Sequence, residues 1–256
     1  MKSEKELMSI KLVEPGEILP VIELHKSVFS PDFISRTIYA SPKVEYYLSN
    51  LIKYPMLQRE HFILGWFEDG DLKGYCHFRA LSDSWHLNYV VILPGYQRLG
   101  IGKNLWVAGT EEGYQRGFRQ VTLDVSQTNV QAMNWYKRQG LQIVEEHWIY
   151  EKQISKIIEP ISEEKSKVSL GGWEAAEAWQ SLYGFSKFHL NYAQRAWFVG
   201  RLGTYFRIFE TIPSIIESTL ALIDADRKLL FILSTPSQET DFEFIECSYR
   251  MQGEIV

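Results

Sequence analysis

The sequence predicts a mixed α/β fold of the α+β kind, with a mostly antiparallel sheet flanked by helices and a second, smaller α+β domain. Three observations predict it: a hairpin signal between extended apolar runs, a glycine turn between a strand and a helix, and a polar linker. The chain has 256 residues, 45% hydrophobic and 23% charged, which suffices for one large or two modest domains.

The first domain is expected over residues 1–155. Asp69-Gly70-Asp71 is a hairpin turn between two apolar runs, and a third extended run follows them. The expected strands are 9–13, 61–68, 73–81, 85–93, 120–125, 141–146 and 148–153. The expected helices are 19–29, 44–57, 104–117 and 130–138, with Gly140 after the last of them.

Residues 156–170 are the expected linker, because they are polar, charge-rich and interrupted by Pro160. The second domain, 171–256, is expected to contain helices 173–182 and 213–223 and strands 204–210, 229–233 and 242–249. Its β-α-β-β order matches the last four elements of the first domain, without a sequence repeat to support duplication. The aromatic residues of segment 173–209 form either the core of this domain, a wall over an acceptor, or a dimer face.

The stretch Gln97–Lys103 is the most informative motif. Gly100 and Gly102 lack a Cβ, so a ligand can approach the backbone closely, and the helix start that follows offers unpaired N–H donors. Arg98 adds positive charge. Strand, glycine turn and helix together predict an anion site. The similar stretch 200–203 precedes a strand, so this argument fails there.

The segment from residue 90 to 141 resembles the GCN5-related N-acetyltransferase (GNAT) superfamily. The family's phosphate motif, Q/R-x-x-G-x-G/A, is matched by Gln97, Gly100 and Gly102. A later family pattern is matched by Asn129, Ala132, Tyr136 and Gly140, with Leu141 replacing the usual Phe. The predicted order of elements over residues 9–155 also matches that fold.

The resemblance implies acetyl-CoA as co-substrate and a set of residues that hold it. Backbone groups of a splayed strand would bond the pantetheine arm, and the turn would hold the pyrophosphate. Asn129 would bind near the pantetheine, and Tyr136 would lie beside the sulfur. The implied backbone contacts are Val90, Val91 and Ile92 on the strand, then Gln97, Arg98, Leu99, Gly100, Ile101, Gly102 and Lys103 in the turn.

Three side chains are candidates for catalysis. Tyr136 can protonate the leaving thiolate, the alternative being a packed helix aromatic next to Trp135. Asp124 lies where some relatives place a catalytic Glu, one methylene longer, and it can equally cap local backbone. His86 is a second candidate base with a suitable intrinsic pKa, although a lone His is often structural. A water chain can replace either base.

Composition excludes several function classes. The net charge of −5 gives no support for nucleic-acid binding, and no apolar run approaches the ~20 residues that cross a bilayer. Cys76 and Cys247 make neither a disulfide framework nor a metal cluster, and Cys76 is expected to be buried rather than nucleophilic. A charged start without a long apolar run disfavours a signal peptide, and a cytoplasmic location is expected.

The function expected is acetyl transfer from acetyl-CoA to a primary amine by direct attack in a ternary complex. The acceptor is a small amine or a peptide amino group, so protein N-terminal or lysine acetylation is one alternative. A non-catalytic acyl-CoA-binding or sensing module is another. The C-terminal domain would shape the acceptor site or form a homodimer.

Overall fold

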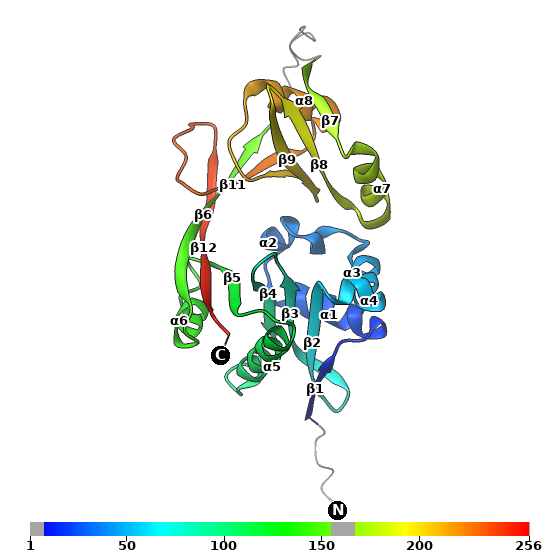
Figure 1. Cartoon of the computed structure of the whole chain (residues 1–256), viewed down its shortest axis with the longest axis vertical. Helices are drawn as coiled ribbons and strands as arrows, with labels where there is room; N and C mark the ends of the chain where they lie inside the picture. The colour runs from blue at the N-terminus through cyan, green and yellow to red at the C-terminus, as the bar shows by residue number, and fades with distance from the viewer. Residues whose placement is uncertain (1–7, 155–166, 256) are drawn as a thin grey trace, which may run out of the picture. The chain divides into compact units, whose positions relative to one another are not determined.

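The computed structural model describes residues 8–154 and 167–255, which fall into two compact units (Figure 1). Unit 1 comprises the described parts of Met1–Pro31, Glu45–Val144 and Arg250–Val256, and unit 2 comprises those of Asp32–Val44 and Glu145–Tyr249. Segments of the two units alternate along the chain, whereas the sequence predicts two consecutive domains. The division into domains 1–155 and 171–256 stays a prediction. Residues 156–166 of the expected linker lie outside the described residues.

Unit 1 contains a mixed sheet in which neighbouring strands are mostly antiparallel. Its strands are, in order across the sheet, β1 (Met8–Leu12), β2 (His61–Glu68), β3 (Asp71–Ala80), β4 (Trp85–Ile92) and β5 (Gln120–Ser126). The pair β4–β5 is parallel. Next to β5 comes β12 (Glu243–Glu254), whose residues from Arg250 onward belong to unit 1. The β2–β3 turn has Asp69 and Gly70 at positive φ, so the hairpin prediction is confirmed.

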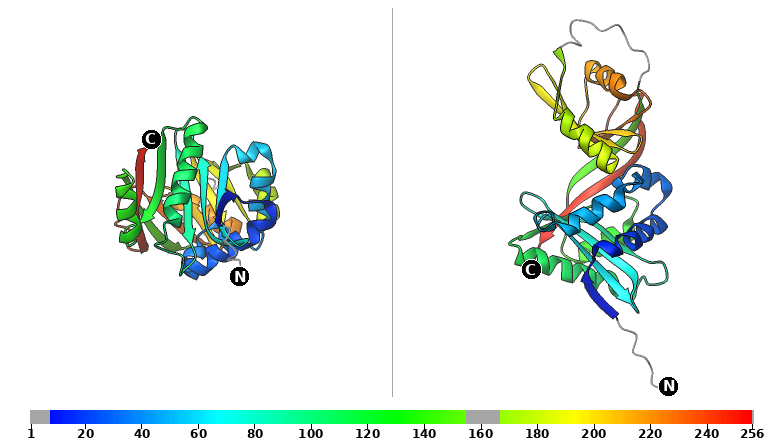
Figure 2. Two further views of the ribbon diagram at one scale, coloured as in Figure 1. Left: turned by 90° about the horizontal axis from the view of Figure 1, so that it is seen from below. Right: turned by 90° about the vertical axis from the view of Figure 1, so that its right-hand side faces the viewer.

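Helices cover both faces of this sheet (Figure 2). The helices of unit 1 are a 3₁₀ turn (Pro15–Glu17), α1 (Ile18–Val28), α3 (Val44–Lys53), α4 (Pro55–Gln58), α5 (Ile101–Gln115) and α6 (Val130–Arg138). α5 packs against β3 and β4 on one face, and α1 packs against them on the other. The expected helix 44–57 is two helices, α3 and α4, because Pro55 cannot continue the first one.

Close packing of α5 on the sheet depends on two glycines. A Cβ at Gly109 would lie 2.2 Å from the Phe78 ring, and one at Gly113 would lie 2.5 Å from Trp85. Trp85 stacks on Phe78 and donates its indole N–H to the Gly109 carbonyl at 2.8 Å. α5 is therefore held in a fixed position against β3 and β4.

The strands of unit 2 also pair in both parallel and antiparallel directions. Its elements are α2 (Pro31–Ser35), a 3₁₀ turn (Ile38–Ala40), β7 (Ser169–Gly171), α7 (Trp173–Tyr183), β8 (Phe185–Tyr192), β9 (Arg195–Leu202), β10 (Tyr205–Ile208), α8 (Ser214–Asp224) and β11 (Lys228–Leu233). The strand order is β12-β6-β11-β10-β9-β8-β7, where β6 is Gln142–Gln153. β6 is one continuous strand, although two were predicted for this stretch.

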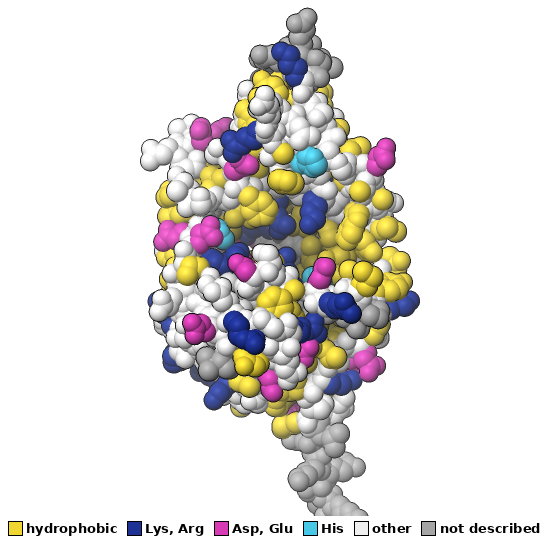
Figure 3. Space-filling model, viewed as in Figure 1, with side chains coloured by type: hydrophobic (Ala, Val, Ile, Leu, Met, Phe, Trp, Pro, Cys, Tyr) yellow, Lys and Arg dark blue, Asp and Glu magenta, His cyan; other side chains and the backbone are white. Residues whose placement is uncertain are grey.

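The strands β7, β8 and β9 were not predicted from the sequence. The β8–β9 hairpin turns through Ala193 and Gln194, both at positive φ. Such a turn is normally marked by Asn or Gly, so the usual sequence signal is missing. The aromatic segment is divided: Phe188 and Phe206 are core residues, whereas Trp179 and Phe198 are exposed. Hydrophobic side chains gather over α7 in Figure 3.

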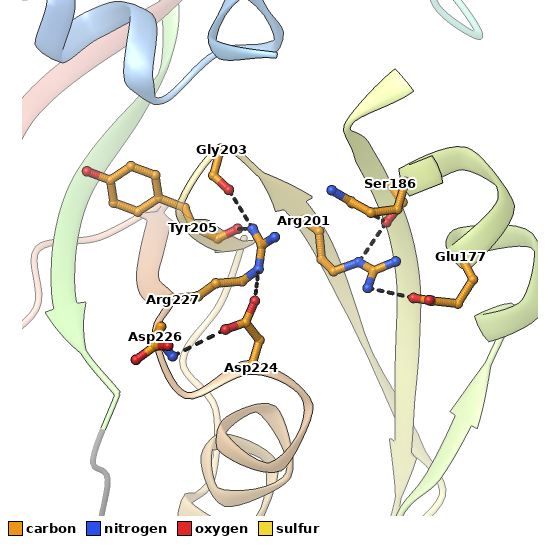
Figure 4. A network of polar contacts seen from close by, with 9 residues as sticks. Glu177, Ser186, Arg201, Gly203, Tyr205, Asp224, Asp226 and Arg227 are labelled. Atoms are coloured by element: carbon orange, nitrogen blue, oxygen red, sulfur yellow. Dashed lines mark hydrogen bonds and ion pairs between the residues drawn. The ribbon is translucent and has the colours of Figure 1, made fainter. Parts of the chain in front are cut away.

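Two arginines tie the elements of unit 2 together (Figure 4). Arg201 of β9 lies over the Trp173 ring, donates to Ser186 Oγ at 2.9 Å and pairs with Glu177 at 2.7 Å. Arg227 pairs with Asp224 at the end of α8 and donates to backbone carbonyls at the start of β10. The stretch 200–203 that resembled a glycine turn forms the end of β9 and leads into β10, so it precedes a strand as predicted.

Within residues 8–154 and 167–255, no helix is long and apolar enough to cross a membrane.

Candidate functional site

The parallel strands β4 and β5 pair only at one end. Their matched residues are Trp85 with Val121, His86 with Thr122 and Leu87 with Leu123, and no pair beyond these is recorded among the described residues. Leu87 and Tyr89 oppose Phe78 and His77 of β3, so Asn88 between them is an extra residue, a β-bulge. Beyond Leu87, the β4 edge that faces β5 therefore has backbone groups outside the ladder.

The free part of the β4 edge includes the residues predicted to bind a pantetheine arm. Val90, Val91 and Ile92 pair with β3 on their other side. Gln97 lies beyond the strand and donates its side-chain N–H to the Ile92 carbonyl at 3.4 Å. The β4–β5 ladder thus ends after Leu87, as an accessible β4 edge requires.

The glycine turn presents backbone N–H groups at the start of α5. Gly100 is the N-cap residue at φ +85°, and Arg98 is also left-handed at φ +65°. The Asn104 N–H donates to the Gly100 carbonyl at 3.0 Å, which leaves the preceding N–H groups of the first turn for a ligand. A Cβ would meet nothing within 4 Å at Gly100, and only Ile92 at 3.9 Å at Gly102, so the backbone is open to close approach.

The predicted contact residues Leu99, Ile101 and Lys103 lie in the same turn. Leu99 is 67% exposed, whereas Ile101 is buried under the start of α5. Lys103 is exposed and adds positive charge at the helix N-terminus, where an anion is already favoured. The turn therefore has the geometry and the charge of an anion site.

α6 positions two further predicted residues. Asn129 is its N-cap, and its side-chain oxygen accepts from the Ala132 N–H at 3.1 Å, which leaves the amide –NH₂ as the group able to donate to a ligand. Tyr136 is buried and packs against Trp106 and Trp135. Burial, with a smaller contribution from Cys76, raises the pKa of Tyr136 above its usual value near 10, so the phenol keeps its proton at neutral pH.

Asp124 is held by an arginine that the sequence analysis did not single out. Arg250 of β12 forms a bidentate pair with it, Nε to Oδ1 at 2.5 Å and a terminal N to Oδ2 at 3.0 Å. The two residues are 126 positions apart, so no local pattern indicates the pair. Only the placement of β12 beside β5 brings it about.

His86 lies next to Asp124 but is enclosed. It is 3% exposed, its Nδ1 lies 3.0 Å from Thr122 Oγ1, and its Nε2 lies 3.8 Å from Asp124 Oδ2. Burial lowers the pKa of His86 to about 4 against the attraction of Asp124, and Arg79 and Arg250 lower it further. The imidazole is therefore neutral at pH 7 and a weak base.

The candidate residues lie on opposite faces of the sheet. Tyr136 packs on Trp106 of α5. His86 and Asp124 face away from α5, because the adjacent Trp85 points toward it and side chains alternate along a strand. The free edge of β4 borders both faces, so a ligand on that edge can meet groups from each.

Cys76 has the environment of a structural residue. It is fully buried, lies 3.5 Å from the Leu105 carbonyl of α5, and burial raises the pKa of its thiol to about 12. The thiolate that a nucleophile requires is thus strongly disfavoured.

An open groove of about 430 Å³ lies elsewhere in unit 1. It is lined by α1 and the β2–β3 hairpin, with Glu17, Glu23 and Lys73 among its polar residues. No residue of the glycine turn lines this groove. We therefore place the candidate cofactor site by the backbone geometry of β4 and the glycine turn, and not by the groove.

Comparisons with known proteins agree with this geometry. The sequence model of the acetyltransferase (GNAT) family matches residues 23–141. A protein of Bacillus subtilis (strain 168), described as a putative ribosomal protein bS18-alanine N-acetyltransferase, is 29% identical over 75 residues. That match covers 29% of this chain, and the chain spans about half the length of this curated relative.

Two solved structures resemble nearly the whole chain in fold. A tandem GNAT protein from the clavulanic acid biosynthesis pathway has a TM-score of 0.69 and 10% identity, with 98% of this chain and 99% of that chain covered. An acetyltransferase from Pyrococcus horikoshii, also described as putative, has a TM-score of 0.63 and 16% identity, with 99% and 92% covered. Residues 23–141 thus form the part of the chain that matches the acetyltransferase (GNAT) family.

Proposed function

We propose that this chain transfers an acetyl group from acetyl-CoA to a primary amine by direct attack in a ternary complex. The observation that carries the proposal is the free β4 edge beyond Leu87, next to a glycine turn with open backbone at Gly100 and Gly102. An extended pantetheine arm can bond such an edge as an added strand, and a pyrophosphate suits the helix start.

In this proposal each part of the site has one task. N–H groups of residues 98–103 hold the pyrophosphate, Val90 to Ile92 hold the arm, and the Asn129 amide donates to it. Acetyl-CoA supplies an acetyl thioester when bound. The amine nitrogen bonds to the acetyl carbon as the carbon–sulfur bond breaks, and the proton lost by nitrogen balances the one gained by sulfur.

Tyr136 is proposed to donate to the departing sulfur. Burial raises the pKa of Tyr136 above about 10, whereas an ordinary thiol has a pKa near 8.5. Complete transfer of the phenol proton to the thiolate therefore costs about 1.4 kcal/mol for each unit by which the two pKa values differ. A hydrogen bond that stabilises the developing thiolate requires no such transfer. We therefore assign Tyr136 the role of hydrogen-bond donor, with the final proton supplied later by water.

Removal of the amine proton is assigned to Asp124, directly or through water. An alkylammonium group has a pKa near 10.4, so a base must act before attack. Asp124 is 38% exposed and lies one residue beyond the last β4–β5 pair, whereas His86 is only 3% exposed and is closed off from an acceptor. Arg250 holds the carboxylate in place. His86, whose Nδ1 contacts Thr122 Oγ1, is assigned a positioning role and not the role of base.

The test combines binding and turnover. Acetyl-CoA affinity is measured by calorimetry, and CoA release is followed across amino acids, polyamines, aminoglycosides and peptides, including a peptide with an N-terminal alanine. Binding with release supports the proposal. Binding without release for any amine indicates a sensing module, and absence of acetyl-CoA binding overturns both. Preference for the alanine peptide favours the protein-acetylating alternative, which the Bacillus relative motivates.

A further inference from the structure

A half-buried arginine near Asp124 has no ion-pair partner among residues 8–154 and 167–255. The Arg79 side chain of β3 makes no hydrogen bond or ion pair with any described residue, and its Nε is buried without a partner in that part of the chain. Burial lowers the pKa of its guanidinium below the ordinary value, against the attraction of Asp124. A buried donor without an acceptor costs free energy, so its retention calls for a functional explanation.

The strand registers place Arg79 on the same face as the proposed base. Arg79 is directly opposite His86 in the β3–β4 ladder, and His86 is opposite Thr122 in the β4–β5 ladder. Asp124 lies two residues beyond Thr122, which returns it to this face. Arg79 therefore borders the end of the paired segment, where the free edge of β4 begins.

The charges at this place do not balance. Asp124 accepts both of its close guanidinium contacts from Arg250, and Arg79 is not within ion-pairing distance of any described carboxylate. His86 is neutral, and the other groups that act on the pKa of Arg79 are the Arg250 guanidinium and the phenols Tyr89 and Tyr47, which are uncharged at pH 7. Two guanidinium groups against one carboxylate leave a net charge of +1, which a monoanion would neutralise.

We propose that Arg79 binds a carboxylate on the acceptor, so that the substrates are amines that also carry a carboxylate. The planar guanidinium fork matches a carboxylate in a two-point contact. The carboxylate would anchor the acceptor on the face that bears Asp124, with its amine toward the free edge of β4. This inference rests on the proposed function and names the acceptor class for it.

The test compares matched acceptors and matched variants. Phenylalanine, phenylalaninamide and phenethylamine share a ring and an amine and differ in the carboxylate, and the same series is built on alanine. Affinity is measured by calorimetry with CoA present, and acetylation is measured separately. The variants are Arg79→Gln, Arg79→Lys and, as a control for lost charge, the exposed Arg59→Gln.

Wild-type protein should bind the acids about 10- to 100-fold more tightly than the amides, the range of a charge-assisted pair. Arg79→Gln should remove this preference and leave acetyl-CoA affinity unchanged, Arg79→Lys should keep part of it, and Arg59→Gln should keep all of it. Equal binding of acids and amides, or a preference that survives in Arg79→Gln, overturns the assignment. If Arg79→Gln fails to fold, the wild-type preference and Arg79→Lys decide. Carboxylate-selective binding without acetylation of any amine would refute the proposed function but leave the Arg79 site standing.

Discussion

The first turn of α5 offers a substitution that should change stability and cofactor affinity in opposite directions. Gly102 is the second residue of α5, and a Cβ there would meet only Ile92, at 3.9 Å. Gly102→Glu therefore fits without a clash. Replacing a helical glycine contributes ~0.5–1 kcal/mol, and an acidic side chain near a helix N-terminus adds ~0.3–1 kcal/mol. The free energy of unfolding should rise by about 1 kcal/mol, which is a few degrees in Tm.

Acetyl-CoA affinity should fall in the same variant. The new carboxylate occupies the region proposed for the pyrophosphate. Two like charges 4 Å apart repel by about 4 kcal/mol at an effective dielectric constant near 20. Since 1.4 kcal/mol is a tenfold change in Kd, a loss of at least about 100-fold is expected.

Calorimetric titration with acetyl-CoA and thermal unfolding of the same samples measure the two effects. Gly102→Ala should raise the free energy of unfolding through helix propensity alone and should bind acetyl-CoA with nearly wild-type affinity. Gly102→Gln adds bulk without charge, so its affinity for acetyl-CoA should fall between those of Gly102→Ala and Gly102→Glu. Wild-type affinity in Gly102→Glu would refute the placement of the pyrophosphate at this turn. A large loss of Tm would refute the packing argument for Gly102.

Three further predictions concern other parts of unit 1. Tyr136→Phe should lower kcat by about 100-fold while the Kd for acetyl-CoA stays constant, and unchanged turnover would remove Tyr136 from catalysis. Because the pKa of His86 is lowered to about 4 in the fold and lies near 6.5 when unfolded, the unfolded state binds more protons between these values; His86 should therefore reduce the free energy of unfolding by about 2 kcal/mol from pH 7 to pH 5. Urea denaturation should show a smaller fall in His86→Gln, and an equal fall would contradict this. Gly113→Ala places a Cβ 2.5 Å from Trp85 and should cost ~1–3 kcal/mol in chemical denaturation, whereas Gly16→Ala, with no atom within 4 Å, should not.

Most elements of unit 1 could be predicted because their signals are local. The Asp69-Gly70 turn, the apolar run of β2 and the glycine turn before α5 each depend on neighbours in sequence. β2 and α6 were predicted at the residues where they occur. In unit 2 the β8–β9 hairpin turns through Ala193 and Gln194, with neither glycine nor asparagine at these two positions. The left-handed backbone there results from the pairing of β8 with β9 and not from a local sequence signal.

The polar part of the site was only partly predictable. Asp124 and His86 were named from their strand positions, but their environment depends on residues far away in sequence. Arg250 reaches Asp124 from β12, and Arg79 reaches the same face through the register of β3 with β4. Strand order and register come from the tertiary fold, so neither arginine was marked by a motif.

Unit 2 shows that the order of elements does not by itself produce a cofactor site. It repeats strand, helix and parallel strand in β10, α8 and β11. However, all four residues of β10 pair with β11, so this strand pair has no free edge like that of β4. α8 follows Pro213, which lacks an N–H, and Glu217 adds negative charge in its first turn. The same order of elements is thus expected to offer an anion site only where the ladder ends early and the helix begins in open glycine backbone, and unit 1 has both features.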